Sequence, residues 1–365
     1  MKDKEISIKS SLETIPVPTQ KLDQIIDDTL FNPPVQKQRS KKRFYQVAAA
    51  AALIIGISTT SMIVSPALAN FVAQIPIIGS VFDYFAVDND EFESYGRFSE
   101  SVGLSQSSKG IDITIDQAVY DGTNVTISFM LKSEEPLGEA IEIAGFPIVK
   151  GAEGSNSSMT YEYVENVGYV GLLTITPDFD NDTERAQAYV SWKPTTIITD
   201  TKEIDGNWTF EFAVSQISGE PIVVDEKVTT DGVTVHLKEI TLTDVSVNIA
   251  YQQLVEPSLL EEWEAVEAEL IASDNLGNVY KVPYNGGSTD GSARTREDFN
   301  WTATLGGLNP EAASLTFYPF AMVSRFNTET NEGESIKLEF DAIEIDLIKQ
   351  SYKIVKNPTI PKLPE

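Results

Sequence analysis

The chain has 365 residues, of which 41% are hydrophobic, so it is long enough to form more than one buried core. It carries 27 basic and 55 acidic residues, and the resulting net charge of −28 disfavours nucleic acid as a partner. It has no cysteine and one histidine, which excludes disulfides, thiolate zinc sites, cysteine nucleophiles and multi-histidine metal centres. We expect no cofactor and no enzymatic activity.

The first 43 residues differ in charge from the rest of the chain. They hold nine bases and six acids, whereas residues 44–365 hold 18 bases and 49 acids, so the net charges are +3 and −31. Thr19 can cap a short helix over residues 20–30. The spacing of its apolar residues puts them on one face, which we predict binds a cytoplasmic protein: Leu22, Ile25, Ile26 and Leu30. A disordered tail with incidental spacing is the alternative.

An uncharged segment follows the basic cluster Lys37–Arg43. The 18 residues Val47–Val64 carry no charge, and a helix of this length spans about 27 Å, close to the roughly 30 Å hydrocarbon core of a bilayer. Because the positive charges lie on its N-terminal side, the N-terminus is expected to be cytoplasmic and the rest exported. We therefore predict a cytoplasmic arm at 1–43 and a transmembrane helix at 44–64, with a cell-membrane location.

Signal-peptide cleavage is the alternative to a retained membrane anchor. Ala67 and Ala69 follow Pro66 and form an A-x-A pattern that suits a cleavage site. The region before the apolar segment is much longer than the N-region of a usual signal peptide, which favours retention. In both cases the chain beyond residue 65 lies outside, and an exported region without cysteine suits a Gram-positive surface.

The exported part has the pattern of β-strands. Ile111, Ile113 and Ile115 alternate with polar residues, Asp121-Gly122-Thr123-Asn124 predicts a turn, and alternation resumes over residues 125–129. This pattern predicts a β-hairpin. The same pattern of apolar and small residues recurs 122 residues later. Residues 111, 113, 115, 118, 120, 125, 127 and 129 are matched, in order, by Val233, Val235, Leu237, Ile240, Leu242, Val247, Ile249 and Tyr251.

The order of the other predicted strands is also repeated. We expect strands at Ile141–Val149, Leu172–Thr176, Ala186–Trp192 and Trp208–Val214, and their counterparts at Val266–Ala272, Trp301–Leu305, Ala313–Phe320 and Ile336–Ile343. Residues 261–270 are expected to form a helical turn that runs into a strand, and the four tryptophans are expected to be core or strand residues. The predicted fold is mainly β, with two tandem immunoglobulin-like β-sandwich domains at 105–219 and 220–350. A linker segment at 65–104 precedes them, and a tail at 351–365 follows.

Two features were weighed as sites. His236 lies between the inward-facing Val235 and Leu237, so we expect it to face solvent, and it suggests no catalytic pair. The acidic residues at 178–182 can supply oxygen ligands for calcium, but they lack the glycine and glutamate spacing of a helix–loop–helix calcium loop. An acidic turn before a strand is the simpler interpretation, and we predict no metal site.

One motif carries a family resemblance. The segment SPALANFVAQIPIIGSVFD, at residues 65–83, resembles a domain-of-unknown-function family of Gram-positive single-pass membrane proteins. The second β-domain resembles the immunoglobulin-like domain that often follows. The resemblance implies an anti-sigma-factor-like protein, because members are often encoded beside an extracytoplasmic-function sigma factor. Residues 1–43 contain no histidine or cysteine, so the zinc-binding type of anti-sigma domain is excluded.

The sequence is consistent with two functions. The first is a membrane regulator whose arm holds a cytoplasmic protein such as a sigma factor and whose exported domains sense or bind an envelope ligand. The alternative is a cell-surface structural or adhesive protein whose β-domains bind wall polymer or another protein.

Overall fold

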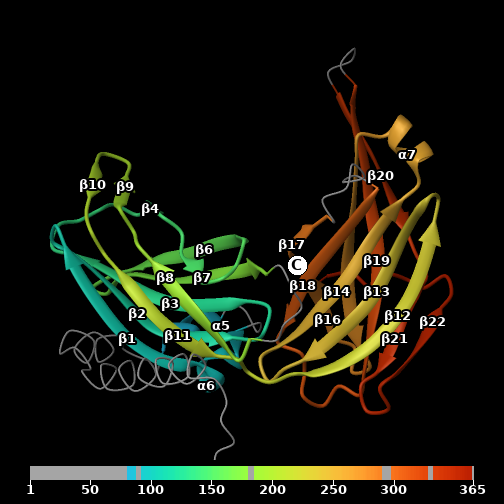
Figure 1. The fold of residues 1–365 in the computed structure, drawn as a ribbon, viewed down its shortest axis with the longest axis horizontal. Helices are drawn as coiled ribbons and strands as arrows, with labels where there is room; N and C mark the ends of the chain where they lie inside the picture. Colours follow the sequence, from blue (N-terminus) through green and yellow to red (C-terminus); the bar gives the residue numbers. More distant parts are fainter. Residues whose placement is uncertain (1–79, 88–91, 180–184, 290–296, 328–331, 364–365) are drawn as a thin grey trace, which may run out of the picture. The chain divides into compact units, whose positions relative to one another are not determined.

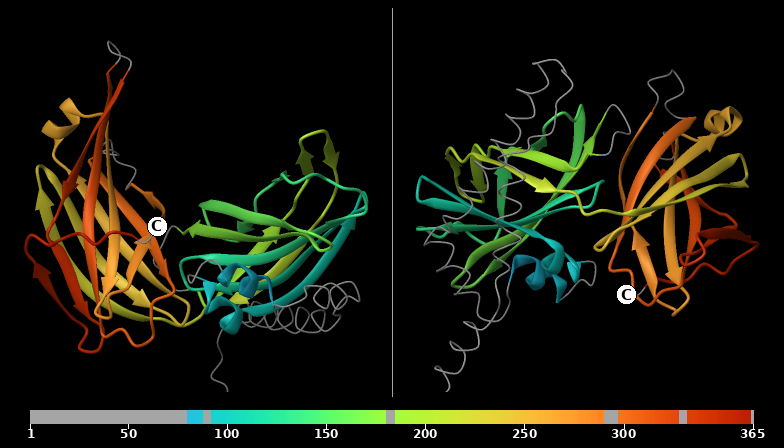
Figure 2. Two further views of the ribbon diagram at one scale, coloured as in Figure 1. Left: turned by 180° about the vertical axis from the view of Figure 1, so that it is seen from behind. Right: turned by 60° about the horizontal axis from the view of Figure 1, so that its bottom comes forward.

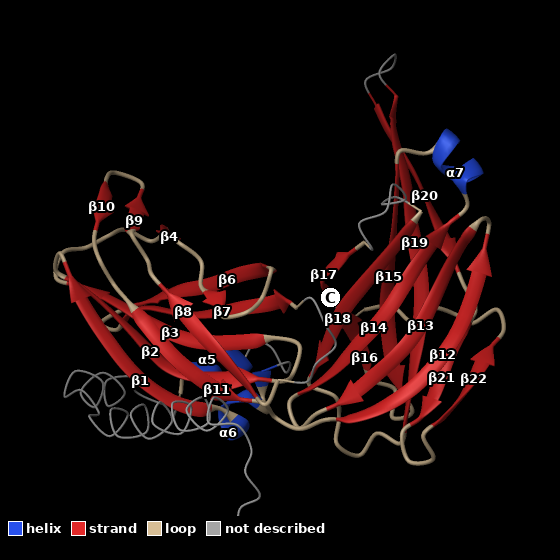
Figure 3. Ribbon diagram, viewed as in Figure 1, coloured by secondary structure: helices blue, strands red, loops and turns tan. Residues whose placement is uncertain are grey.

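The computed structural model describes residues 80–87, 92–179, 185–289, 297–327 and 332–363. All of them belong to one compact unit, Ser61–Glu365. Strands dominate this part of the chain, and its helices are short (Figure 3). None of the helices described is long and apolar enough to cross a membrane. The predicted arm at 1–43 and the predicted span Val47–Val64 lie outside the described residues.

The first half of the described chain is built on a five-stranded antiparallel sheet, which we call the first sheet (Figure 1). Its strands, in spatial order, are β1 (Glu100–Ser108), β2 (Ile111–Tyr120), β3 (Val125–Ser133), β7 (Gly168–Asp178) and β6 (Gly154–Val164). The predicted hairpin is confirmed as β2 and β3. The apolar residues of the pattern, including Ile111, Ile113 and Phe129, are fully buried in the core. Polar residues between them, such as Thr126 and Ser128, are buried as well, so both faces of the hairpin are largely covered.

Two three-stranded sheets complete the first half. One contains β10 (Glu203–Asp205), β9 (Thr196–Thr199) and β4 (Ile141–Ala144), and the other contains β11 (Phe210–Ser215), β8 (Gln187–Trp192) and β5 (Ile148–Val149). The continuous strand predicted at Ile141–Val149 is therefore wrong. Gly145 interrupts it with a left-handed φ of 95°, and a Cβ there would lie 2.9 Å from the carbonyl oxygen of Lys193.

The second half repeats the five-stranded order. Its strands are β12 (Glu220–Thr230), β13 (Val233–Leu242), β14 (Ser246–Val255), β18 (Asp298–Gly306) and β17 (Tyr284–Ser288). The opposing sheet contains β16 (Val279–Val282), β15 (Ala265–Asp274), β19 (Ser314–Asn327), β21 (Ala342–Asp346) and β22 (Ser351–Val355), with β20 (Glu332–Glu339) also paired to β19. Helix α7 (Pro257–Glu262) precedes β15, so a helical turn does run into a strand as predicted, but the turn begins four residues before the predicted range 261–270, most of which belongs to β15.

The two hairpins pair in the same register at an offset of 122 residues. Ile111 faces Ser133 and Val233 faces Val255, while Phe129 and Tyr251 face Ile115 and Leu237. The preceding strands follow the same offset, with a bulge after Ser101 in β1 and after Val223 in β12. Left-handed residues also recur at matching places, at Gly103 and Asp225 and again at Lys109 and Asp231. The repeat therefore extends to the irregularities of the backbone.

Each half buries its own hydrophobic core between its sheets. The core of the first half includes Ile127 of β3, together with the fully buried Trp192 and Trp208. The core of the second half includes Tyr251, Phe317 and Trp263. All four tryptophans are core or strand residues, as predicted: three are buried in the cores, and Trp301 lies on β18. Trp301 is only half-buried, and its ring packs on Phe299 with centroids 4.4 Å apart.

Two short helices pack on the face of the first sheet that points away from its core (Figure 2). They are α5 (Val81–Ala86) and α6 (Tyr95–Phe98), and they lie in the segment that the sequence assigns to a linker. Phe82 and Phe85 of α5 form an apolar cluster with Met130, Val170 and Leu172 of the sheet. Ser80 caps α5 by accepting a hydrogen bond from the amide of Asp83 at 3.2 Å.

Gly171 of β7 marks a close contact inside the first half. It pairs with Phe129, and a Cβ at this glycine would lie 2.5 Å from the Phe129 ring and 2.9 Å from the carbonyl oxygen of Thr160. The second half has Trp301 paired with Tyr251 at the equivalent place, with ring centroids 6.4 Å apart. The two halves therefore share a register, but this position holds a glycine in the first half and a tryptophan in the second.

Candidate functional site

The residues predicted to bind a partner or to be cleaved lie outside the described part of the chain. These are Leu22, Ile25, Ile26 and Leu30 of the arm, and Ala67 and Ala69 of the proposed cleavage site. Their roles stay predictions. Of the acidic residues at 178–182, residues 180–182 are also outside it. Among the residues that the structure describes, no group of three or more histidines and carboxylates is placed to hold a metal ion.

His236 is buried, so the prediction that it faces solvent is wrong. Only 9% of the residue is exposed, and the bulge in β12 places Asp225 beside it. The Oδ1 atom of Asp225 lies 2.7 Å from Nε2 of His236. Asp225 has a φ of 48°, where the equivalent residue of the first half is Gly103. The hydrogen bond to His236 thus stabilises Asp225 in a left-handed backbone conformation, which glycine adopts without strain.

A polar network joins the two halves. The Asp121 carboxylate, in the turn between β2 and β3, accepts hydrogen bonds at Oδ1 from the amides of Thr123 and Asn124, at 2.9 and 2.6 Å. Its Oδ2 accepts a 2.7 Å bond from the hydroxyl of Ser246, and its backbone carbonyl accepts a 3.0 Å bond from Asn248. Burial raises the pKa of this carboxyl. A turn residue of the first half therefore binds the corresponding turn of the second.

Asn124 extends this network across the sheets. Its Nδ2 donates to Oγ1 of Thr304 at 2.7 Å, and its Oδ1 accepts from the hydroxyl of Thr176 at 2.6 Å. The Thr304 hydroxyl in turn donates to Oδ1 of Asn248 at 3.0 Å. Because these groups are buried or half-buried and satisfied by one another, they fix the two turns against each other.

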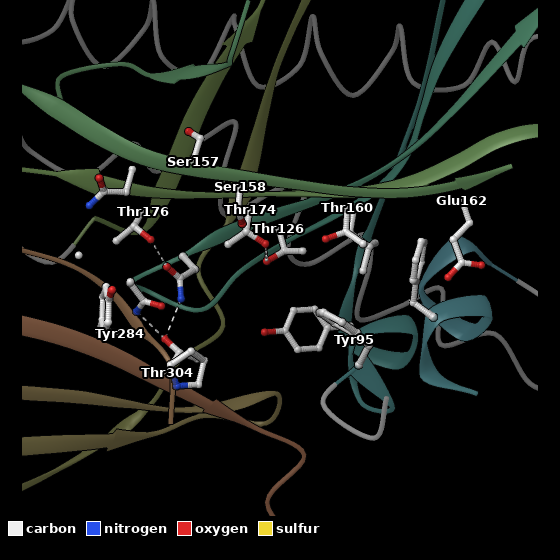
Figure 4. Close-up of a pocket in the computed structure, with 18 of the residues that line it drawn as sticks. Tyr95, Thr126, Ser157, Ser158, Thr160, Glu162, Thr174, Thr176, Tyr284 and Thr304 are labelled. Carbon is white, nitrogen blue, oxygen red and sulfur yellow. Dashed lines mark hydrogen bonds between the residues drawn. The ribbon is translucent and has the colours of Figure 1, made fainter. Parts of the chain in front are cut away.

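A cavity of about 660 Å³ lies beside this network. Its floor is the outer face of the first sheet beyond the part covered by α5 and α6, and hydroxyl side chains line it: Thr126, Ser158, Thr160, Thr174 and Thr176. Figure 4 shows these residues on the strands, with Tyr95 on one side and Tyr284 and Thr304 on the other. The volume is in the range of sites for small molecules, about 300–1,000 Å³.

Two walls of different origin enclose the floor. One is aromatic and comes from α5, α6 and the residues between them: Tyr84, Phe85, Phe92 and Tyr95. The other comes from the second half, through Pro283, Tyr284 and Asn285. Asn285 donates a 2.8 Å hydrogen bond to Thr304, so this wall is tied to the junction network. A ligand in the cavity would therefore touch both halves at once.

The lining is nearly free of charge. Of the described residues that line it, Glu162 is the one charged group, and its carboxylate accepts a 2.7 Å hydrogen bond from the Tyr84 hydroxyl. Hydroxyls and amides both donate and accept hydrogen bonds, and aromatic rings offer apolar faces. The arrangement can hold a neutral polar ligand, and it has no general base paired with a nucleophile among these lining residues.

This site was not predicted from the sequence. Its floor includes the edge strand β6, which was not among the predicted strands, although Met159 and Tyr161 alternate with polar residues and pack against the first core. The cavity-facing Ser158 and Thr160 are exposed, so the sequence does not distinguish them from ordinary solvent-facing strand residues. Asp121 was predicted only as a turn residue, and its bond to Ser246 links positions 125 residues apart. The run of small hydroxyl residues at 155–160 was the available signal.

Comparison with known proteins gives two family matches. Residues 39–133 match a domain of unknown function (DUF4179), and residues 219–347 match a family of unknown function (DUF5643). The expected resemblance to a domain of unknown function is thereby confirmed at that level. No curated protein matches the sequence.

Two solved structures are similar to different degrees. The crystal structure of the conserved domain protein from Bacillus anthracis has a TM-score of 0.64 and 25% sequence identity, and the match covers 74% of this chain and all of that one. The structure of collagen adhesin from S. aureus gives a TM-score of 0.14 at 9% identity, over 69% of this chain and 96% of that one. The second value is too low to support any argument.

Proposed function

We propose that this protein is a single-pass membrane regulator, anti-sigma-factor-like in design. Its arm at 1–43 binds a cytoplasmic protein such as an extracytoplasmic-function sigma factor, and residues 44–64 cross the membrane. Outside, residues 105–219 and 220–350 form two tandem immunoglobulin-like β-sandwich domains that sense or bind an envelope ligand.

The extent of one family match carries this proposal. The match at 39–133 begins in the basic cluster, continues through the uncharged segment and ends at the last residue of β3. A single family pattern thus joins the predicted membrane segment to the first strands of the first sheet. A membrane segment and an exported β-domain that recur together suit a protein that connects the two sides of a membrane.

The junction between the two halves supports the sensing role. The Asp121 carboxylate and Asn124 tie the first half to Ser246 and Thr304 of the second. Because the cavity beside this network touches both halves, a ligand there can change how firmly they are held. Such a change is the kind of signal that an exported domain can pass to its membrane segment.

The arm provides the decisive test. Burial of each of its four apolar side chains removes surface worth about 1.5–3 kcal/mol, and ordering a short segment costs an estimated 2–5 kcal/mol. Micromolar binding, about −8 kcal/mol, thus needs most of the four. In the full chain, the double change Ile25→Asp and Ile26→Asp should abolish co-purification of the sigma factor and release transcription of its target genes.

A matched pair of acidic residues is the control. Asp27→Asn with Asp28→Asn should leave capture nearly intact, because exposed charges contribute about 0–1 kcal/mol. Both double variants should reach the membrane in equal amounts. Retention of the partner by the Ile25→Asp, Ile26→Asp chain, or unchanged transcription, would contradict the proposal and favour a surface structural or adhesive protein with an inert arm.

A further inference from the structure

The cavity beside the junction combines three independent features. Its floor is a sheet face of hydroxyl side chains, one wall is a group of aromatic rings, and the other wall comes from the opposite half of the protein. In Figure 4 these surfaces face a common space. No hydrogen bond to another described residue is formed by the hydroxyls of Ser158 and Thr160, both of which are exposed on β6. They are free to bind a ligand.

The charge of the lining selects against ions. No lysine, arginine or histidine is among the described residues that line the cavity, so a phosphate or carboxylate would find no counter-charge. Glu162 and the net charge of −28 would repel an anion further. A cation would find this single carboxylate already bonded to Tyr84. The ligand that fits is neutral.

The geometry also separates small polar ligands from peptides. An extended peptide that adds to a sheet pairs with the backbone of an edge strand. Here the cavity is built instead from side chains on the sheet face, of which Thr126 and Thr174 belong to the inner strands β3 and β7. Hydroxyl groups that donate and accept, next to aromatic faces that cover C–H surfaces, match a molecule with many hydroxyls on a compact ring.

We infer that this cavity is a binding site for a neutral saccharide. Ser158, Thr160 and Thr174 bind its hydroxyl groups, and Tyr284 packs against a ring face from the second half. The inference names the ligand class of the sensor region and so rests on the proposed function for its biological setting. Binding itself does not require the arm to capture a partner.

The test uses the full chain in detergent micelles and isothermal titration calorimetry. The probes are the neutral trisaccharides cellotriose, chitotriose and mannotriose, with trigalacturonate as the anionic match and an uncharged hexapeptide as the alternative ligand. At least one neutral trisaccharide should bind saturably, and trigalacturonate should bind at least tenfold more weakly. If no neutral trisaccharide binds at millimolar concentration, or if trigalacturonate or the peptide binds more tightly, the inference is overturned.

Matched variants locate the site. The double change Ser158→Ala and Thr160→Val, and separately Tyr284→Ala, should each weaken binding at least tenfold. The controls are Thr316→Val on β19 and Tyr352→Ala on β22, whose tyrosine is 42% exposed against 46% for Tyr284. All four variants should unfold at the same temperature as the parent chain. Equal losses in the site and control variants, or no loss in the site variants, would refute the location.

The two proposals fail separately. If saccharide binding is absent while the Ile25→Asp, Ile26→Asp variant still loses its partner, the regulator stands without this ligand. If saccharide binding is present but the arm captures nothing, the cavity stands as a binding site on a surface protein.

Discussion

The hydroxyl of Ser246 donates a 2.7 Å hydrogen bond to the carboxylate of Asp121, across 125 residues of sequence. The two residues lie in the equivalent turns of the two repeats, between β2 and β3 and between β13 and β14. Asp121 is 2% exposed and Ser246 is 3% exposed. The contact therefore joins the halves through groups that water does not reach.

Removing the Asp121 side chain should weaken both its own turn and the junction. Asp121→Ala leaves the amides of Thr123 and Asn124 and the Ser246 hydroxyl without their acceptor, so we expect a loss of about 1–3 kcal/mol in the free energy of unfolding. Asp121→Asn keeps an acceptor for both amides and removes a buried charge. It should be neutral or stabilising at pH 7, as measured by urea unfolding. A larger loss for Asn than for Ala would contradict this account.

The contribution of Asp116 and Asp121 to stability should increase as the pH is lowered from 7 towards 3.8. Burial raises the pKa of Asp116 and of Asp121 above the ordinary value of 3.8. Because the folded chain then holds these protons more tightly than the unfolded chain, their contribution is fully present below pH 3.8 and is lost as pH rises through the folded pKa values. Asp341 acts oppositely, since its hydrogen bond to Lys356 lowers its pKa, and its contribution is lost on acidification below 3.8.

Urea unfolding at pH 4 and pH 7 measures this difference. Asp121→Asn should reduce the change between the two pH values, because it removes one of the buried carboxyls. Equal stability of the parent chain at both pH values, or an unchanged pH dependence in Asp121→Asn, would show that the buried carboxyl does not control it.

A methyl group at Gly171 should be strongly destabilising. An alanine Cβ would lie 2.5 Å from the Phe129 ring, so the ring must leave its packed position. Overpacking of this kind costs about 1–3 kcal/mol. Gly154→Ala on β6 is the control in the same sheet, because nothing lies within 4 Å of its added Cβ. Thermal unfolding should show a large decrease for Gly171→Ala and almost none for Gly154→Ala. Similar values for both would refute the contact.

The predicted topology has a direct test in intact cells. The charges at Lys37–Arg43 and the uncharged Val47–Val64 run predict that the N-terminus is inside. Protease added outside should therefore digest an epitope tag after residue 363 and spare a tag at residue 1. Permeabilised cells should lose both tags. Digestion of the N-terminal tag in intact cells would overturn the orientation.

The alternation of Ile111, Ile113 and Ile115 with polar residues predicted the hairpin, and the same pattern predicted its repeat. It did not predict that the polar residues between them, Thr114 and Asp116, are buried too. Strand β6 was not predicted, although Met159 and Tyr161 alternate with polar residues and pack against the core. Helices α5 and α6 are too short to form alone and depend on contacts such as that of Phe82 with the first sheet.

The site escaped prediction for a related reason. Its residues come from the strands of the first sheet, from the two helices and from the segment around Tyr284, and no local pattern links them. His236 was predicted to face solvent, but it is buried and bonded to Asp225, which lies at a bulge that the pattern of apolar residues does not reveal. Local periodicity therefore predicted the strands. Tertiary contacts determine which residues line the cavity and which partner His236 binds.

The contact between Phe129 and Gly171 also bears on how two copies of one design fold in the same chain. Because β3 and β14 share a register, β18 can offer β3 the same backbone hydrogen bonds as its proper neighbour β7. That exchange would place Trp301 where Gly171 belongs, and no Cβ fits there beside Phe129. Misassembly between neighbouring copies is a characteristic failure of repeat proteins. The absent side chain at Gly171 therefore disfavours the pairing of β3 with β18.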